Sequence, residues 1–375
     1  MRRFFHILLL LSILLVTGCV EPLVHEKPRL YIRVDIPQES ITKATVGEES
    51  SLSEEQAIKD FQVWVFRHSD EATATPIGYK NFTSGELGLI KKGYADAWYL
   101  DLDEAVAKAA PNVDVYALAN YKSVKSGTYN GSSTRQSLDA VLLNNFGTAS
   151  PQASVPGNGL PYSAVKKNIP MTGTFPMLEL ESVTLTRAVS KVTFLFCQVC
   201  VDDEDKTLVE QFSIDNLTLS GGTICSKEYL FNDTGTGIKV NAVSDSDYDQ
   251  DPIVLTSPEL ARNPFPQKYS YRPNEYPNET AAEYSSRLKQ AVTDGLLTRT
   301  VYYLRESDRQ LSGTFTYSIG LQTGLTGSFT MNAAGDFSRN HDWIVYIYFL
   351  ADTIQFEVSA VGWTTGGKFY LTPES

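Results

Sequence analysis

Histidine and cysteine are scarce in this sequence, with four of each among 375 residues. Beyond residue 20 the histidines are His25, His68 and His341, which lie far apart and show neither HExxH nor HxH spacing. The sequence therefore offers few residues for a catalytic zinc site or a histidine-based triad. The Gly-x-Ser-x-Gly elbow is also absent, and Gly235-Thr236-Gly237 lacks the third glycine of a dinucleotide-binding loop. We predict a chain that is not an enzyme and holds no cofactor.

Basic residues are outnumbered by acidic ones, 32 against 44, which gives a net charge of −12 and a pI near 4.9. No run rich in Lys or Arg occurs after the first 20 residues. Proteins that bind nucleic acid present a basic patch or stripe to the phosphate backbone. The sequence therefore argues against a nucleic-acid partner.

One acidic stretch resembles a metal-binding loop, with aspartates at alternate positions: Asp245, Asp247, Asp249 and Asp251. Oxygen ligands at every second residue can surround Ca²⁺, but such a loop needs glycine at its sixth position and glutamate at its twelfth. Those two positions hold Gln250 and Thr256. We favour a solvated acidic loop, with these four aspartates as the alternative metal ligands.

The N-terminus has the form of a bacterial lipoprotein signal. Arg2 and Arg3 precede an apolar run over residues 7–16, and Thr17-Gly18-Cys19 follows it. The run is too short to span about 30 Å of hydrocarbon at about 1.5 Å per residue. We predict signal cleavage between Gly18 and Cys19 and an acyl anchor such as palmitate on Cys19. The mature chain would then work outside the cytoplasm, tied to a membrane.

Three cysteines remain after Cys19: Cys197, Cys200 and Cys225. An odd number in an oxidising compartment leaves at least one thiol unpaired, which excludes a disulfide framework. Cys197 and Cys200 lie in a strand-like run with no second pair, which argues against redox or metal chemistry. A bridge from Cys225 to either of them and buried free thiols both remain open.

Residues 30–36 form the first predicted strand, with apolar side chains at every second position: Leu30, Ile32, Val34 and Ile36. A polar segment, residues 38–53, follows it and contains Lys43-Ala44. Exposed segments of this composition are preferred sites of proteolysis. We predict a strand that stands apart from the rest, and a cut between Lys43 and Ala44 would release it together with the lipid.

Abundant Tyr and Phe, 20 and 18 residues, and frequent clusters of turn-forming residues predict a mostly β chain. A capping box at residues 53–56 predicts a helix to residue 59, and a second helix is expected over 137–145. We predict further strands at residues 61–66, 97–102, 113–120, 183–186, 191–201, 212–220, 301–304, 313–319, 327–331, 343–349 and 354–363. Residues 147–168 are expected to be loop, and 241–298 a long polar excursion with a Tyr/Pro-rich middle at 264–277.

Several segments, taken in order, resemble the fimbrillin family, the lipoprotein-born subunits of surface fimbriae (type V pili) in Gram-negative anaerobes. They are Ser53-Glu-Glu-Gln with Phe61-Gln-Val-Trp-Val-Phe66, Asp114-Val-Tyr-Ala-Leu-Ala-Asn120, Ile169-Pro-Met-Thr-Gly173, Leu185-Thr-Arg-Ala-Val-Ser-Lys-Val-Thr-Phe194, Val301-Tyr-Tyr-Leu-Arg-Glu306, and Ser338-Arg-Asn-His341 with Trp363. The resemblance covers nearly the whole mature chain.

This resemblance implies an all-β fold of two β-sandwich domains with transthyretin-like, Greek-key topology and short helices in the connections. We expect residues 1–18 to be the signal peptide, 19–43 the tether and removable first strand, 44–182 the N-terminal domain and 183–375 the C-terminal domain, with the boundary between Gly173 and Arg187. It also implies that a trypsin-like protease removes the first strand and that a C-terminal strand of the next subunit takes its place. Candidate donor side chains are Phe356, Val358 and Val361, or Phe369 and Leu371.

The expected partners are other fimbrial subunits, the outer-membrane lipid, the processing protease and a host or bacterial surface ligand, at the cell surface. One departure matters, because many stalk subunits of the family carry arginine at the cleavage site and this loop offers only Lys43. An uncut chain would be an anchor, and a tip adhesin is a further alternative. A surface glycan-binding or glycan-degrading lipoprotein is the alternative from another class, since paired carboxylates can come from any strands.

Overall fold

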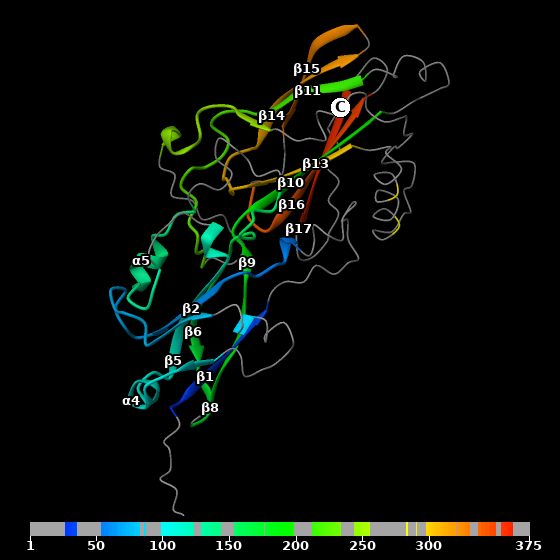
Figure 1. The fold of residues 1–375 in the computed structure, drawn as a ribbon. Coiled ribbons are helices and arrows are strands. Elements are labelled where there is room, and N and C mark those ends of the chain that lie inside the picture. The colour runs from blue at the N-terminus through cyan, green and yellow to red at the C-terminus, as the bar shows by residue number, and fades with distance from the viewer. Residues whose placement is uncertain are drawn as a thin grey trace, which may run out of the picture.

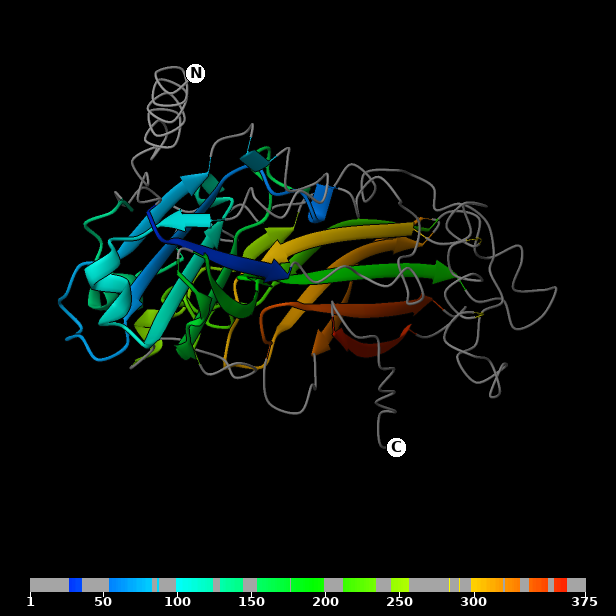
Figure 2. The same ribbon diagram turned by 90° about the horizontal axis from the view of Figure 1, so that it is seen from below.

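The structure, a computed structural model, describes residues 27–35, 54–82, 86–87, 99–123, 129–143, 154–175, 177–198, 212–233, 244–255, 283, 290, 298–319, 321–330, 337–349 and 354–362. Strands dominate these residues, and the predicted all-β fold is confirmed. Figures 1 and 2 show an elongated molecule with the two halves of the chain at opposite ends. Within the described ranges, no helix is long and apolar enough to cross a membrane.

The first half of the chain forms two sheets, with strand orders β4-β1-β8-β7 and β3-β2-β5-β6-β9. The strands are β1 (Arg29–Asp35), β2 (Phe61–Arg67), β3 (Gly78–Phe82), β4 (Tyr99–Asp101), β5 (Asn112–Ala119), β6 (Tyr162–Pro170), β7 (Thr172–Thr174), β8 (Met177–Thr184) and β9 (Thr186–Arg187). Short helical turns lie in the connections: α4 (Glu104–Lys108), η2 (Tyr121–Ser123) and α5 (Arg135–Asp139).

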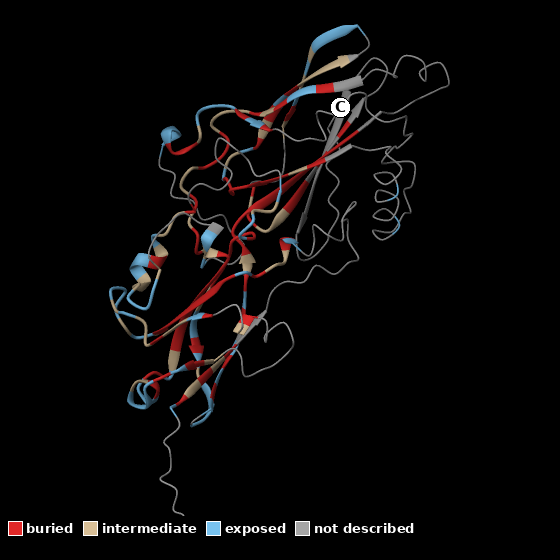
Figure 3. Ribbon diagram, in the orientation of Figure 1, coloured by how far each residue is buried: buried red, intermediate tan, exposed pale blue. Residues whose placement is uncertain are grey.

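These two sheets share one apolar core. β2 and β5 are apolar on both faces and buried along nearly their whole length, which is typical of strands covered on both sides (Figure 3). Trp64 lies in this core, with the rings of Tyr79 and Phe231 at 5.6 and 6.4 Å between centroids. Its indole nitrogen Nε1 donates to the carbonyl oxygen of Asn130 at 2.8 Å, so the buried polar atom is satisfied.

The second half also forms two sheets, with strand orders β13-β10-β16-β17 and β12-β11-β14-β15. The strands are β10 (Ser190–Gln198), β11 (Phe212–Leu219), β12 (Ile253–Leu255), β13 (Thr298–Leu304), β14 (Ser312–Ile319), β15 (Gln322–Thr330), β16 (His341–Phe349) and β17 (Ile354–Gly362), and η3 (Asp245–Asp247) is a helical turn before β12. Val192, Phe194 and Phe196, at every second position of β10, lie in a second core. Each half is therefore a two-sheet sandwich, as predicted.

The two sandwiches meet where the chain passes from β9 to β10, between Arg187 and Ser190, close to the end of the predicted boundary interval. A segment after β11 returns to the first sandwich. The backbone nitrogen of Leu143 donates to the carbonyl of Glu228 at 2.9 Å, and that of Leu230 donates to Val141 at 2.8 Å. Leu230 and Phe231 are part of the first core. The N-terminal sandwich is thus completed by residues from the second half of the chain.

Two predicted helices end earlier than expected. The helix predicted over 137–145 is α5 (Arg135–Asp139), which begins earlier because the Thr134 side chain accepts from the backbone nitrogen of Ser137 at 3.1 Å. The helix predicted to residue 59 ends at Glu55 in the described part of the chain, and the backbone is irregular from Ala57 to β2.

The prediction of a loop over residues 147–168 is wrong at its end, where β6 begins. Lys166 and Lys167 interrupt the apolar pattern of this strand because its second half faces solvent. β3, β7, β12 and the first part of β8 and of β15 were not predicted either. They are short, or polar on exposed faces, so apolar periodicity carries little signal for them.

Candidate functional site

The first strand, β1, lies inside a sheet and does not stand apart as the sequence suggested. It pairs antiparallel with β4, from Arg29↔Asp101 to Tyr31↔Tyr99, and parallel with β8, from Arg29↔Met177 to Asp35↔Thr184. Figure 1 shows β1 beside β8 at the N-terminal end of the molecule. Both edges of β1 are therefore engaged, and its loss would leave unpaired backbone groups on two neighbours.

The inner face of β1 is apolar. Leu30 and Ile32 are buried in the first core. Leu100 of β4 and Leu178 and Leu180 of β8 are their partners across the sheet, and these side chains are also buried. Burying one Leu or Ile side chain stabilises by about 1.5–3 kcal/mol, so β1 contributes several kcal/mol through its side chains alone.

The outer face of β1 carries aromatic and cationic contacts. The rings of Tyr31 and Tyr99 lie 5.8 Å apart between centroids. The guanidinium of Arg29 lies 4.8 Å from the centre of the Tyr99 ring, and the Lys80 ammonium lies at the same distance from that ring. Exposed cation–π contacts contribute about 0.5–1 kcal/mol each, so they favour this register without fixing the strand irreversibly.

The other predicted features of this site are only partly described. Gly18, Cys19, Lys43 and Ala44 lie outside the described residues, as do Phe369 and Leu371. The alternative donor positions, Phe356 to Val361, lie in β17, which pairs antiparallel with β16 along its whole length. A donor strand taken from these positions would have to leave its own sheet.

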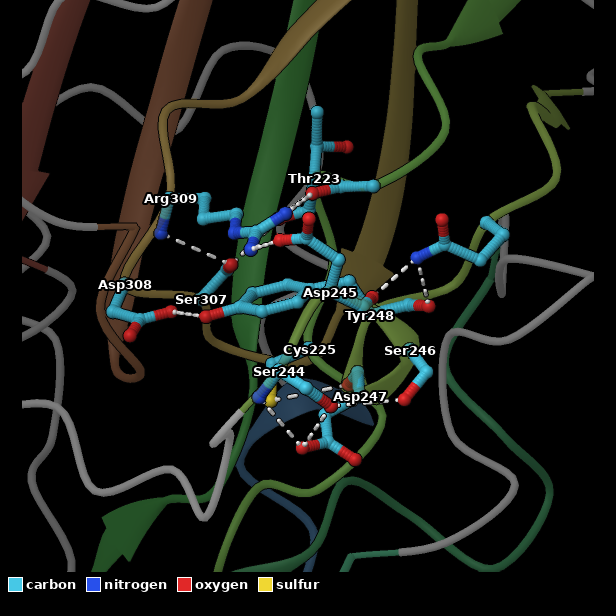
Figure 4. Close-up of polar contacts among 12 residues, drawn as sticks. Thr223, Cys225, Ser244, Asp245, Ser246, Asp247, Tyr248, Ser307, Asp308 and Arg309 are labelled. Atoms are coloured by element: carbon cyan, nitrogen blue, oxygen red, sulfur yellow. Dashed lines mark hydrogen bonds and ion pairs between the residues drawn. The ribbon is translucent and has the colours of Figure 1, made fainter.

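The acidic loop holds ion pairs. Asp245 pairs with Arg309 (Figure 4). Asp247 pairs with Lys227, and Asp249 pairs with Arg305, whose Nη2 lies 2.7 Å from the carboxylate. The guanidinium of Arg309 also lies 3.4 Å from the centre of the Tyr248 ring, and Asp251 is exposed. Three of the four carboxylates thus have cationic partners, and no group of three metal-ligating side chains occurs in the described part of the chain.

Cys225 is buried and free, so it forms neither of the disulfide bridges that the sequence left open. Its Sγ accepts from the backbone nitrogen of Lys227 at 3.3 Å. Burial raises the pKa of this thiol, although the Lys227 contact acts in the opposite direction. A buried thiol with a raised pKa is a poor nucleophile, and Cys225 is a packing residue.

Sequence reasoning missed a set of buried charges where the sandwiches meet. Nη2 of Arg339 lies 2.6 Å from Oε1 of Glu306 and 3.1 Å from Oε1 of Glu228. The Arg339 guanidinium also donates to the carbonyl oxygens of Tyr229 and Leu230, which belong to the segment that completes the first core. Arg339 lies more than 100 positions along the chain from Tyr229 and Leu230, so no local spacing in the sequence indicates the cluster. The cluster ties the turn before β16 to the returning segment.

Glu228 gives this cluster a pH dependence. Burial raises its pKa well above the usual range, although Arg339 acts in the opposite direction. A carboxyl with a higher pKa in the folded than in the unfolded chain makes stability fall as pH rises between the two values. We therefore expect Glu228→Gln to raise the melting temperature more at about pH 8 than at about pH 5, because only the wild-type chain loses this stability as pH rises. Thermal melts at both pH values check this, and an equal shift at both would contradict it.

Comparison with known proteins gives structural matches only. No protein-family model matches the chain, and no curated protein matches it in sequence. Three similar structures are from Porphyromonas gingivalis. The tip fimbrial protein Mfa3 with a C-terminal truncation has a TM-score of 0.47 and 13% identity, over 90% of this chain and 100% of that one. A fimbrilin has a TM-score of 0.48 and 10% identity, over 92% and 100% of the two chains. The fimbrial anchor protein Mfa2 has a TM-score of 0.41 and 10% identity, over 90% of this chain and 98% of that one.

Proposed function

We propose that this chain is a structural subunit of surface fimbriae that assembles by strand exchange and supports adhesion. The observation that carries the proposal is the position of β1 between β4 and β8, with Leu30 and Ile32 in the core. Such a strand can be replaced by another extended segment that offers apolar side chains at alternate positions. The ordered segments that resemble fimbrillins support the same class of function.

In this proposal Cys19 carries the lipid that delivers the precursor to the outer membrane. A trypsin-like protease then cuts after Lys43 and frees β1 together with the anchor. The empty slot exposes two rows of unpaired backbone groups above apolar side chains, which strongly favours the capture of a new strand. The partner is a further fimbrial subunit, and the processed chain carries no catalytic role.

The proposal is tested by trimming the purified precursor with trypsin. We expect the cut to fall between Lys43 and Ala44 and the trimmed chains to form ladders on a gel, because each open slot captures a strand from another copy. Peptide mapping identifies the new N-terminus. A synthetic peptide with the sequence of β1, Arg29–Asp35, should suppress the ladders when present in excess.

The matched control is Lys43→Gln, which removes the trypsin site and should leave the chain monomeric under the same treatment. Trimmed wild-type chains that stay monomeric would contradict the polymer-subunit role. That result would favour a surface glycan-binding or glycan-degrading lipoprotein instead. A surface-extracted protein that still begins at a lipidated Cys19 would indicate an anchor subunit that keeps its own first strand.

A further inference from the structure

A buried lysine with two carboxylates lies where the first sandwich covers the outer face of the second. Lys191 is on β10, and its side chain is 1% exposed. Its Nζ lies 3.0 Å from Oε1 of Glu55 and 3.4 Å from Oδ2 of Asp342. The Glu55 side chain is also 1% exposed, and that of Asp342 is 12% exposed.

The backbone holds the lysine and one of the carboxylates side by side. β10 and β16 are neighbouring parallel strands, and Lys191 is in register with Asp342. Two residues further along β10, the Thr193 hydroxyl donates to Oδ1 of Asp342 at 2.9 Å. Because the hydroxyl binds Oδ1, the other carboxylate oxygen, Oδ2, is the one that lies near the lysine. The same hydrogen bond polarises the carboxyl group. The Asp342 carbon is thereby presented to Nζ on a rigid sheet.

Glu55 is positioned from the other sandwich. The Tyr303 hydroxyl donates to its Oε1 at 2.6 Å, and Tyr303 is the partner of Lys191 on the opposite side of β10. Burial raises the pKa of Glu55, but the charge of Lys191, the Tyr303 hydrogen bond and the charge of Arg187 together bring it below the usual value. Oε1 of Glu55 lies 3.0 Å from Nζ of Lys191, which is within the reach that proton transfer between the two groups requires.

We propose that Lys191 and Asp342 form an intramolecular isopeptide bond, with Glu55 as the proton carrier. Glu55 takes one proton from the Lys191 ammonium, and the free amine attacks Cγ of Asp342. The new C–N bond forms as one C–O bond breaks, and the departing oxygen leaves as water with two of the three ammonium protons. One ammonium and one carboxylate thus give one amide and one water, with no oxidant, reductant or cofactor. The step also removes two buried charges, each of which is costly to desolvate.

Asp342 is the acceptor of the bond, although Nζ lies closer to an oxygen of Glu55. Lys191 and Asp342 are fixed opposite each other by two paired strands, and the Thr193 hydroxyl can stabilise the oxyanion that forms on Oδ1. Glu55 is a helical residue of the other sandwich and accepts from the Tyr303 hydroxyl. That placement suits a group that moves protons and is not itself consumed.

The bond would act as a covalent clasp at the start of the second sandwich. β10 is its first strand and follows the first sandwich directly, so tension along the chain enters the sheet through β10. An amide from β10 to β16 would pass this load to the next strand without breaking the ladder of backbone hydrogen bonds. The proposal does not depend on strand exchange, since it concerns the monomer.

Peptide mass mapping of the purified full-length chain tests the proposal. After digestion with trypsin under reducing conditions, we expect the peptide 188–206, with no cut after Lys191, joined to the peptide 340–368. Their mass should be the sum of the two peptides less one water. Separate, unmodified peptides would overturn the proposal, and so would a link from Lys191 to the peptide that contains Glu55.

Variants separate the chemistry from the packing. Lys191→Arg and Asp342→Ala cannot form the amide, and Glu55→Gln keeps its shape but cannot carry the proton. We expect each to lack the linked peptide and, because the chain is no longer looped, to migrate more slowly than wild type on a denaturing gel. Lys167 and Asp233 are an internal control: Nζ lies only 2.7 Å from Oδ2, but the side chains are 40% and 29% exposed. A linked peptide in Glu55→Gln at the wild-type yield would overturn the role of Glu55.

Discussion

Replacing Arg339 with methionine is expected to lower the free energy of unfolding by about 3–5 kcal/mol, the usual cost of removing one partner from a buried ion pair. Methionine keeps the aliphatic part of the side chain, so the loss comes from the charge and the hydrogen bonds of the guanidinium. Glu306 and Glu228 would remain buried without the guanidinium that lies 2.6 and 3.1 Å from them. The hydrogen bonds to the carbonyls of Tyr229 and Leu230 would also be lost. Urea unfolding of Arg339→Met against wild type measures the change.

The control is the exposed pair of Lys108 and Glu104 on α4, whose side chains are 59% and 52% exposed. Lys108→Met should change the free energy of unfolding by about 0.5 kcal/mol or less, because solvent screens an exposed pair of this spacing. Adding Glu306→Gln and Glu228→Gln to Arg339→Met should restore part of the stability, since no carboxylate would then be stranded. Similar losses for Lys108→Met and Arg339→Met would contradict the importance of burial.

Replacing Leu30 with alanine in the uncut precursor is expected to lower the free energy of unfolding by about 2–5 kcal/mol, the range for a buried leucine. Leu30 is fully buried, and it faces Leu100 on one side and Leu178 on the other within the sheet. The cavity opens along the strand that the proposed function requires to be exchanged. We therefore expect Leu30→Ala also to be displaced faster by the β1 peptide. Urea unfolding and a peptide-capture time course measure the two effects.

Leu321 supplies the matched control, since it is the same residue type and 99% exposed. The free energy of unfolding of Leu321→Ala should lie within about 0.5 kcal/mol of the wild-type value. If Leu30→Ala were as mild, β1 would contribute little to the first sandwich. Its removal would then not leave a slot that demands a new strand.

The parts of the fold that the sequence predicted are those with a strong apolar pattern. β2, β5 and β10 consist largely of buried side chains, and their ranges agree with the predicted strands to within about two or three residues, the usual uncertainty of strand ends. β6 was missed because Lys166 and Lys167 face solvent in its second half. β15 was largely missed for the same reason, since most of its side chains are exposed.

The candidate site was also predicted only in part. The alternation at Leu30 and Ile32 predicted a strand with one apolar face, and both residues are buried. Its position between β4 and β8 could not be predicted, because pairing with residues about 70 and 150 positions away leaves no local signal. The same holds for Lys191, whose two carboxylate partners come from residues 55 and 342. Only the topology brings those three side chains together.

The pairing of β1 determines how subunits would be oriented along a fibre. β1 runs parallel to β8 and antiparallel to β4, and its side chains Leu30 and Ile32 lie in the core. A strand that takes its place with the same pairing would have its N-terminus beside Met177. Every subunit joined in this way would point the same way along the fibre, since the contact is heterologous and does not close on itself. One end of the fibre would always present an open slot and the other a free strand, so growth and capping would be distinct events at distinct ends.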